Sequence, residues 1–165
     1  MTDSEKRVYR HLAEHRLTYR IAAHKRVSAI SECVIAEKLL GGVMPRNLFL
    51  SPRNESHFYL LIAHPESVFR TSSVSRQAGA SRLSFGSEEA LGRLLHTHSG
   101  AVSPLGLIFD EDRRVTLLVD RKLLTENALI FHPLENTASV RMGKDVFFHG
   151  FLSSVSRDFT VIDME

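Results

Sequence analysis

The apolar residues of this chain form short segments whose spacing switches repeatedly between helical and strand-like. Apolar residues recur at helical spacing in residues 2–16, whereas residues 57–63 and 115–119 are short apolar runs typical of strands. The segments mix without a regular strand–helix–strand repeat, which favours the α+β class. The 165 residues fit one domain, so we predict a single domain over residues 1–165 with a mixed, largely antiparallel β-sheet surrounded by helices.

Capping and turn residues set the boundaries of the predicted elements. Thr2 and Glu5 have the spacing of a capping box, and Gly41-Gly42 ends the second helix. Helices are predicted at residues 2–16, 28–40, 73–78, 87–95 and 144–153. Strands are predicted at residues 18–23, 47–51, 57–63, 82–85, 105–109, 115–119, 128–132, 136–141 and 159–163. The strand at 105–109 is expected to pair with the strand at 115–119.

Composition restricts the setting of the protein. Cys33 is the single cysteine, which excludes an intramolecular disulfide and a thiolate metal cluster. No segment approaches the ~18 consecutive apolar residues of a membrane span, and the charged first residues lack the apolar core of a secretory signal. We therefore expect a cytoplasmic protein with no membrane partner. The basic segment from Lys6 to Arg26 either attracts phosphate or forms a solvated surface.

Several common catalytic motifs are absent from the sequence. There is no Walker loop, no dinucleotide-binding fingerprint, no HExxH zinc motif and no GxSxG nucleophile elbow. We therefore expect neither a metal nor a cofactor. The chemistry open to such a chain is a reaction that a positioned water molecule can perform.

Three sequence blocks resemble a known family when they are taken together and in order. They are MPRNLFLS at 44–51, SGAVSPLGLIFDEDRRVTLLVD at 99–120 and IFHPLENTASVRM at 130–142, with RLSFGSEEALGRLL between the first two and FTVIDM near the end. This pattern resembles the YbaK/prolyl-tRNA-synthetase-associated domain family, in particular its free-standing prolyl-tRNA deacylase branch, over nearly the whole chain. The resemblance implies a mixed sheet with surrounding helices.

The resemblance also implies a reaction and its partners. Members of that branch hydrolyse the ester of alanyl-tRNA(Pro), which prolyl-tRNA synthetase makes in error. We therefore expect a trans-editing aminoacyl-tRNA deacylase with water as nucleophile, tRNA as partner and prolyl-tRNA synthetase as a candidate second partner. Two alternatives stay open, namely deacylation of another small amino acid such as serine, and a tRNA-binding or regulatory relative without catalysis.

The active site of the family joins a Lys-Asn pair, a GxxxP loop and a histidine that follows a strand. The corresponding residues here are Arg46-Asn47, His132 and the loop of Gly100, Ala101, Val102, Ser103 and Pro104. Arg46 stands where the family has a lysine. Arginine stays protonated, so Arg46 can hold the terminal phosphate of tRNA but cannot accept a proton.

Each of these residues has a functional and a purely structural interpretation. The loop that begins at Gly100 either turns main-chain N–H groups toward a developing oxyanion or is a plain turn before the next element. His132 either binds the terminal adenosine or orients water, or else bonds to a backbone carbonyl. Asn47 hydrogen-bonds the amine or ribose of the substrate, or a neighbouring loop.

Selection of alanine over proline is expected to depend on the size of a pocket. A small apolar pocket that admits only small side chains acts as a second sieve, because a synthetase discriminates weakly against a smaller amino acid. Candidates for its wall are Ile21, Val27 and Val34, and the alternative is that all three are ordinary core residues.

Overall fold

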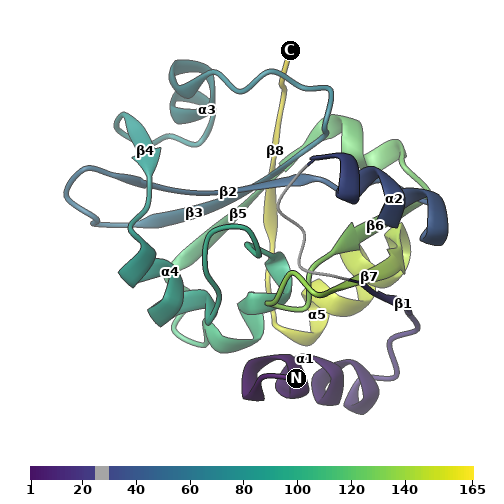
Figure 1. Cartoon of the computed structure of the whole chain (residues 1–165). Coiled ribbons are helices and arrows are strands. Elements are labelled where there is room, and N and C mark those ends of the chain that lie inside the picture. Colours follow the sequence, from purple (N-terminus) through teal and green to yellow (C-terminus); the bar gives the residue numbers. More distant parts are fainter. Residues whose placement is uncertain (25–29) are drawn as a thin grey trace.

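The structure, a computed structural model, describes residues 1–24 and 30–165, and its strands form two sheets (Figure 1). A three-stranded antiparallel sheet has the order β1-β7-β6, and a five-stranded mixed sheet has the order β4-β2-β3-β5-β8. The strands are β1 (Arg20–Ala23), β2 (Arg46–Pro52), β3 (Phe58–Ala63), β4 (Leu83–Phe85), β5 (Val115–Asp120), β6 (Ala128–Phe131), β7 (Ala138–Gly143) and β8 (Phe159–Ile162). The predicted α+β class is confirmed, although the strands form two sheets instead of one.

Helices surround the sheets, and their caps follow the sequence signals. The helices are α1 (Asp3–Glu14), α2 (Ile30–Leu40), α3 (Thr71–Gln77), α4 (Glu88–Leu95), the 3₁₀-helices η1 (Pro104–Phe109) and η2 (Arg121–Thr125), the π-helix η3 (Val146–Phe151) and α5 (Leu152–Ser154). Thr2 and Glu5 form the predicted capping box, each side chain accepting a hydrogen bond from the backbone of the other. Within the described residues, no helix has the length and apolar character needed to cross a membrane.

Alternation along the strands places a core on each face of the five-stranded sheet. In β3, Leu60 and Ile62 belong to the larger core beneath α1, α4 and η1. Leu61 and Ala63 point to the opposite face and pack in a smaller core with Val74 of α3. Successive side chains of a strand point to opposite faces, so a nearly continuous apolar run marks a strand covered on both sides.

One predicted strand is wrong. Residues 104–109 form the 3₁₀-helix η1, which begins at the cap of Ser103 with Pro104 in its first turn. The expected pairing of 105–109 with 115–119 therefore does not exist. Instead β5 lies between β3 and β8 and is parallel to both.

The two sheets meet near the start of β2. Val43 bridges Leu129 of β6, with the N–H of Val43 donating to the carbonyl of Ala128 at 3.0 Å. Gly42 has a φ of +110°, and a Cβ at this position would lie 2.8 Å from the Ala128 carbonyl oxygen. Glycine is therefore needed for this close approach. The contact brings the first residues of β2 beside the end of β6.

Candidate active site

A cleft of about 350 Å³ opens where these elements meet. Its wall combines the start of β2, the end of β6, α2 and the loop that precedes η1. The lining residues are Val34, Glu37, Met44, Pro45, Arg46, Asn47, Pro65, Gly100, Val102, Ile130, Phe131 and His132. The structure thus brings together the three motifs that the sequence keeps far apart.

Arg46 is the cationic group of the cleft. It is the first residue of β2 and pairs with Ala63, the last residue of β3. Its Nη2 donates to the main-chain oxygen of Ser67 at 2.5 Å, and the side chain is otherwise exposed. The guanidinium is therefore fixed on one side and keeps further N–H donors for an anion.

The loop that holds Arg46 is anchored by Asp120, which is 0% exposed. One carboxylate oxygen of Asp120 accepts from the hydroxyl of Ser67 at 2.6 Å and from the N–H of His64 at 2.9 Å. The ammonium of Lys122 donates to the Ser67 hydroxyl at 3.1 Å. Because a buried carboxylate with such donors strongly constrains its neighbours, residues 64–67 present the Ser67 carbonyl to Arg46 in a defined place.

The loop at residues 100–104 supplies main-chain donors, but fewer than expected. Gly100 has a φ of +91°, a left-handed conformation that favours glycine. The N–H of Ala101 donates to the carbonyl of His98 at 3.0 Å and is thus already used. Within the described part of the chain, the N–H groups of Gly100 and Val102 have no acceptor, and both residues line the cleft.

Ala101, Ser103 and Pro104 have structural roles in the same loop. All three are buried and none lines the cleft. The carbonyl of Ala101 accepts from the hydroxyl of Thr97 at 2.8 Å. The hydroxyl of Ser103 caps η1 by accepting from the N–H of Leu105 at 3.2 Å. These contacts fix the loop so that Gly100 and Val102 face the cleft.

His132 makes the backbone contact of the structural interpretation and also lies on the wall of the cleft. It is 8% exposed, its Nδ1 lies 2.9 Å from the carbonyl oxygen of Ala138, and it also lines the cleft. A carbonyl oxygen only accepts, so Nδ1 carries the hydrogen and Nε2 is an acceptor in the neutral ring. Burial lowers the pKa of His132 below its ordinary value of 6.5, and His24 acts in the same direction. The neutral imidazole is therefore favoured at neutral pH.

Two polar side chains complete the wall near Arg46. The Oδ1 of Asn47 is buried and has no hydrogen-bond donor among the residues described. A buried acceptor without a partner is costly, so this oxygen is available to a donor that enters the cleft. Glu37 of α2 also lines the cleft, and its carboxylate accepts from the N–H of Met44 at 2.8 Å. Glu37 carried no sequence signal of its own, because only the packing of α2 places it here.

The predicted apolar wall is only partly in place. Val34 lines the cleft and is 40% exposed. Ile21 is 49% exposed on β1 and is not among the residues that line the cleft. Val27 lies outside the described residues. Besides Val102, which belongs to the predicted loop, the apolar residues that the structure adds are Met44, Pro45, Pro65, Ile130 and Phe131.

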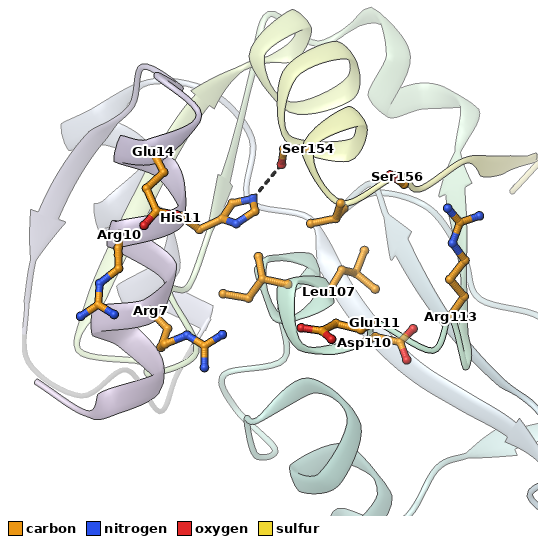
Figure 2. Close-up of a pocket in the computed structure, with 12 residues that line it drawn as sticks. Arg7, Arg10, His11, Glu14, Leu107, Asp110, Glu111, Arg113, Ser154 and Ser156 are labelled. Atoms are coloured by element: carbon orange, nitrogen blue, oxygen red, sulfur yellow. Dashed lines mark hydrogen bonds between the residues drawn. The ribbon is translucent and has the colours of Figure 1, made fainter.

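A second cavity, of about 420 Å³, lies between α1, η1 and α5 (Figure 2). It has charges of both signs, since Arg7, Arg10 and Arg113 line it together with the carboxylates of Glu14, Asp110 and Glu111. It contains none of the predicted site residues. Within the described residues, no three His, Cys, Asp or Glu side chains form a group that could hold a metal ion.

The arrangement defines a class of protein before any relative is considered. It is a small α+β domain whose largely apolar cleft offers a fixed cation, two main-chain donors and a neutral imidazole. Solved structures share this fold. One is a candidate trans-editing enzyme for prolyl tRNA synthetase, with a TM-score of 0.75 at 17% identity over 100% of this chain and 98% of that chain. Another comes from work on grafting linear epitopes onto scaffold proteins, with a TM-score of 0.76 at 16% identity over the same shares.

The sequence comparison is more specific. The chain belongs to the aminoacyl-tRNA editing domain family, whose model matches residues 24–147. It is 29% identical over 138 residues to the prolyl-tRNA editing protein ProX of Acetoanaerobium sticklandii, covering 84% of each chain. It is 30% identical over 119 residues to prolyl-tRNA synthetase associated domain-containing protein 1 of Danio rerio, covering 71% of this chain and 64% of that protein. The chain is accordingly an aminoacyl-tRNA hydrolase.

Proposed function

We propose that this enzyme removes alanine from mischarged tRNA(Pro) and so corrects an error of prolyl-tRNA synthetase. One observation carries the proposal. The cleft brings together Arg46, the unpartnered N–H groups of Gly100 and Val102, and His132, which are the groups that ester hydrolysis at a tRNA 3′ end requires. The names of the relatives from Acetoanaerobium sticklandii and Danio rerio support prolyl-tRNA as the substrate class.

The proposed reaction is addition of water to the ester carbonyl carbon. The carbonyl oxygen becomes negative and accepts hydrogen bonds from Gly100 and Val102, and one such donor typically contributes about 2.7–4 kcal/mol to the transition state. The bond between the carbonyl carbon and the ribose oxygen then breaks. One proton of the water passes to the ribose oxygen, which leaves free alanine and a tRNA with an intact 3′ hydroxyl.

The remaining groups bind the substrate and orient the water. Arg46 holds the phosphate of the terminal nucleotide, since its guanidinium is exposed beyond its bond to Ser67. The buried Oδ1 of Asn47 accepts from the α-ammonium or from a ribose hydroxyl. The carboxylate of Glu37 adds a negative charge on the same side for the α-ammonium. The Nε2 of neutral His132 accepts a hydrogen bond from the water or the adenosine.

A panel of charged tRNAs tests the substrate. The purified protein is incubated with alanyl-, seryl- and prolyl-tRNA(Pro), and the fraction of amino acid still esterified is followed with time. We expect rapid loss of alanine, slower loss of serine and no loss of proline above the buffer control, because the pocket excludes the larger ring. If serine is lost faster than alanine, serine is the substrate and alanine is not. No loss of any amino acid would overturn the proposed function.

A further inference from the structure

A long segment next to the cleft contains arginine but no acidic residue. From Ser67 to Ser87 the chain has three arginines, Arg70, Arg76 and Arg82, and no aspartate or glutamate. Arg53 joins them from the turn after β2. Within the described residues, Arg70 pairs with Glu165, whereas Arg53, Arg76 and Arg82 form no ion pair. The segment therefore carries an uncompensated positive charge.

These arginines line two adjoining hollows on the surface around α3 and β4. The first is lined by Phe69, Arg70, Thr71, Ser72, Ser75, Arg76, Ala80 and Arg82. The second is lined by Pro52, Arg53, Asn54, Ser81, Arg82 and Ser84. Arg82 lines both, so the two hollows adjoin at this residue, and we call them together the arginine groove. Its walls contain no carboxylate.

The arginine groove begins at the edge of the cleft. Ser67, whose carbonyl binds Arg46, is two residues before Phe69. Its far end lies beside Pro52, the last residue of β2, whereas Arg46 is the first. With a rise of about 3.3 Å per residue, the seven residues of β2 span about 20 Å. Phe85, 68% exposed on the edge strand β4, lies near the groove with its ring 6.2 Å from that of Phe69.

The second cavity of Figure 2 is a useful contrast. Its lining combines three arginines, Arg7, Arg10 and Arg113, with the carboxylates of Glu14, Asp110 and Glu111, so it carries charges of both signs. A polyanion gains little from such a mixed surface, whereas it gains from a row of arginines with no carboxylate in its lining. The charge pattern therefore singles out the arginine groove, although both surfaces contain several arginines.

We propose that the arginine groove binds the phosphodiester backbone of the tRNA acceptor stem while the 3′ end occupies the cleft. This inference rests on the proposed function, because it takes the cleft as the site of the 3′ terminus. A tRNA anchored there extends well beyond the length of β2, and the groove provides a path along which its phosphates meet guanidinium groups. Arginine forks suit the phosphate oxygens that the backbone of a paired stem presents.

The test compares two double variants that remove the same charge. R76Q/R82Q alters the arginine groove, and R10Q/R113Q alters the cavity of Figure 2. The affinity for uncharged tRNA(Pro) is measured at several salt concentrations by fluorescence anisotropy. We expect R76Q/R82Q to weaken binding on the order of tenfold and to reduce the salt dependence of log Kd by about 1 per arginine. R10Q/R113Q should bind like the wild type.

Hydrolysis separates this inference from the proposed function. For alanyl-tRNA(Pro), R76Q/R82Q should raise KM with little change in kcat, and an alanylated CCA trinucleotide, which ends short of the groove, should be hydrolysed alike by all three proteins. A further outcome is that the wild type hydrolyses neither substrate while R76Q/R82Q still binds tRNA more weakly than the wild type. That result would support the arginine groove as a tRNA-binding surface and would overturn the proposed function. Unchanged tRNA affinity in R76Q/R82Q, or an equal loss in R10Q/R113Q, would overturn the groove.

Discussion

Arg46 is the residue at which this chain departs from the family pattern, and its surroundings explain how an arginine serves there. Its Nη2 donates to the carbonyl of Ser67 at 2.5 Å, which fixes one side of the guanidinium. The other N–H groups remain exposed for a phosphate. The proposed role of Arg46, holding a phosphate, needs a permanent charge and no proton transfer, so arginine and lysine can both perform it.

We expect different substitutions of Arg46 to lower the deacylation activity by different amounts. R46A should lower kcat/KM for alanyl-tRNA(Pro) about 10- to 100-fold, because hydrogen bonds to charged groups contribute about 1.5–3 kcal/mol. R46K should retain more activity than R46A, since it keeps the charge and loses only the fork. Deacylation under single-turnover conditions, together with tRNA binding, measures both effects.

R93A is the matched control for this series, because Arg93 is an exposed arginine on α4 that pairs with Glu89 and lies outside the cleft. It should leave deacylation unchanged. An R46A variant that binds and hydrolyses like the wild type would remove Arg46 from the site.

At the scale of elements, the segment between β3 and α3 holds the Arg46 side chain in place, although most of the segment does not line the cleft. Asp120 ends β5, is completely buried, and accepts from Ser67, His64 and the N–H of Lys122. The Arg46 guanidinium is therefore tied through Ser67 to the end of a central strand. A change at Asp120 should reach the cleft without any contact with the substrate.

D120N tests this connection. The amide turns an N–H donor toward groups that are themselves donors, so the free energy of unfolding should fall by about 1–3 kcal/mol. Because Arg46 loses its fixed partner, KM for alanyl-tRNA(Pro) should rise more than kcat falls. Denaturant unfolding and steady-state kinetics measure the two effects. D112N makes the same charge change at an exposed carboxylate and should alter neither; if D120N has a wild-type KM, Asp120 has no positioning role.

Local elements were predictable where sequence signals act locally. The cap of Thr2 and Glu5 and the apolar runs at 57–63 and 115–119 depend on neighbouring residues, and the structure confirms the helix and both strands. Residues 105–109 were mistaken for a strand because a short apolar run fits a strand and a buried helical turn equally well. Ser103-Pro104, a typical cap followed by a first-turn proline, was the signal that could have decided it.

At the scale of the whole molecule, long-range pairing determined what the sequence could not predict. The insertion of β5 between β3 and β8, and the division of the strands into two sheets, depend on contacts between distant segments. The convergence of Arg46, Gly100 and His132 was expected only through the family resemblance. Only the folded chain shows that Glu37 and Pro65 line the cleft. It also shows that the N–H of Ala101 already donates to the carbonyl of His98.

The central claim is that the N–H groups of Gly100 and Val102 face the reacting ester while Arg46 holds the adjacent phosphate. A crystal structure with 3′-alanylamino-3′-deoxyadenosine 5′-phosphate, in which an amide replaces the ester, measures this directly. The account predicts the alanyl carbonyl oxygen at about 2.7–3.2 Å from both main-chain nitrogens and the phosphate against the Arg46 guanidinium. An alanyl carbonyl bound away from residues 100–102, with the phosphate turned from Arg46, would contradict it.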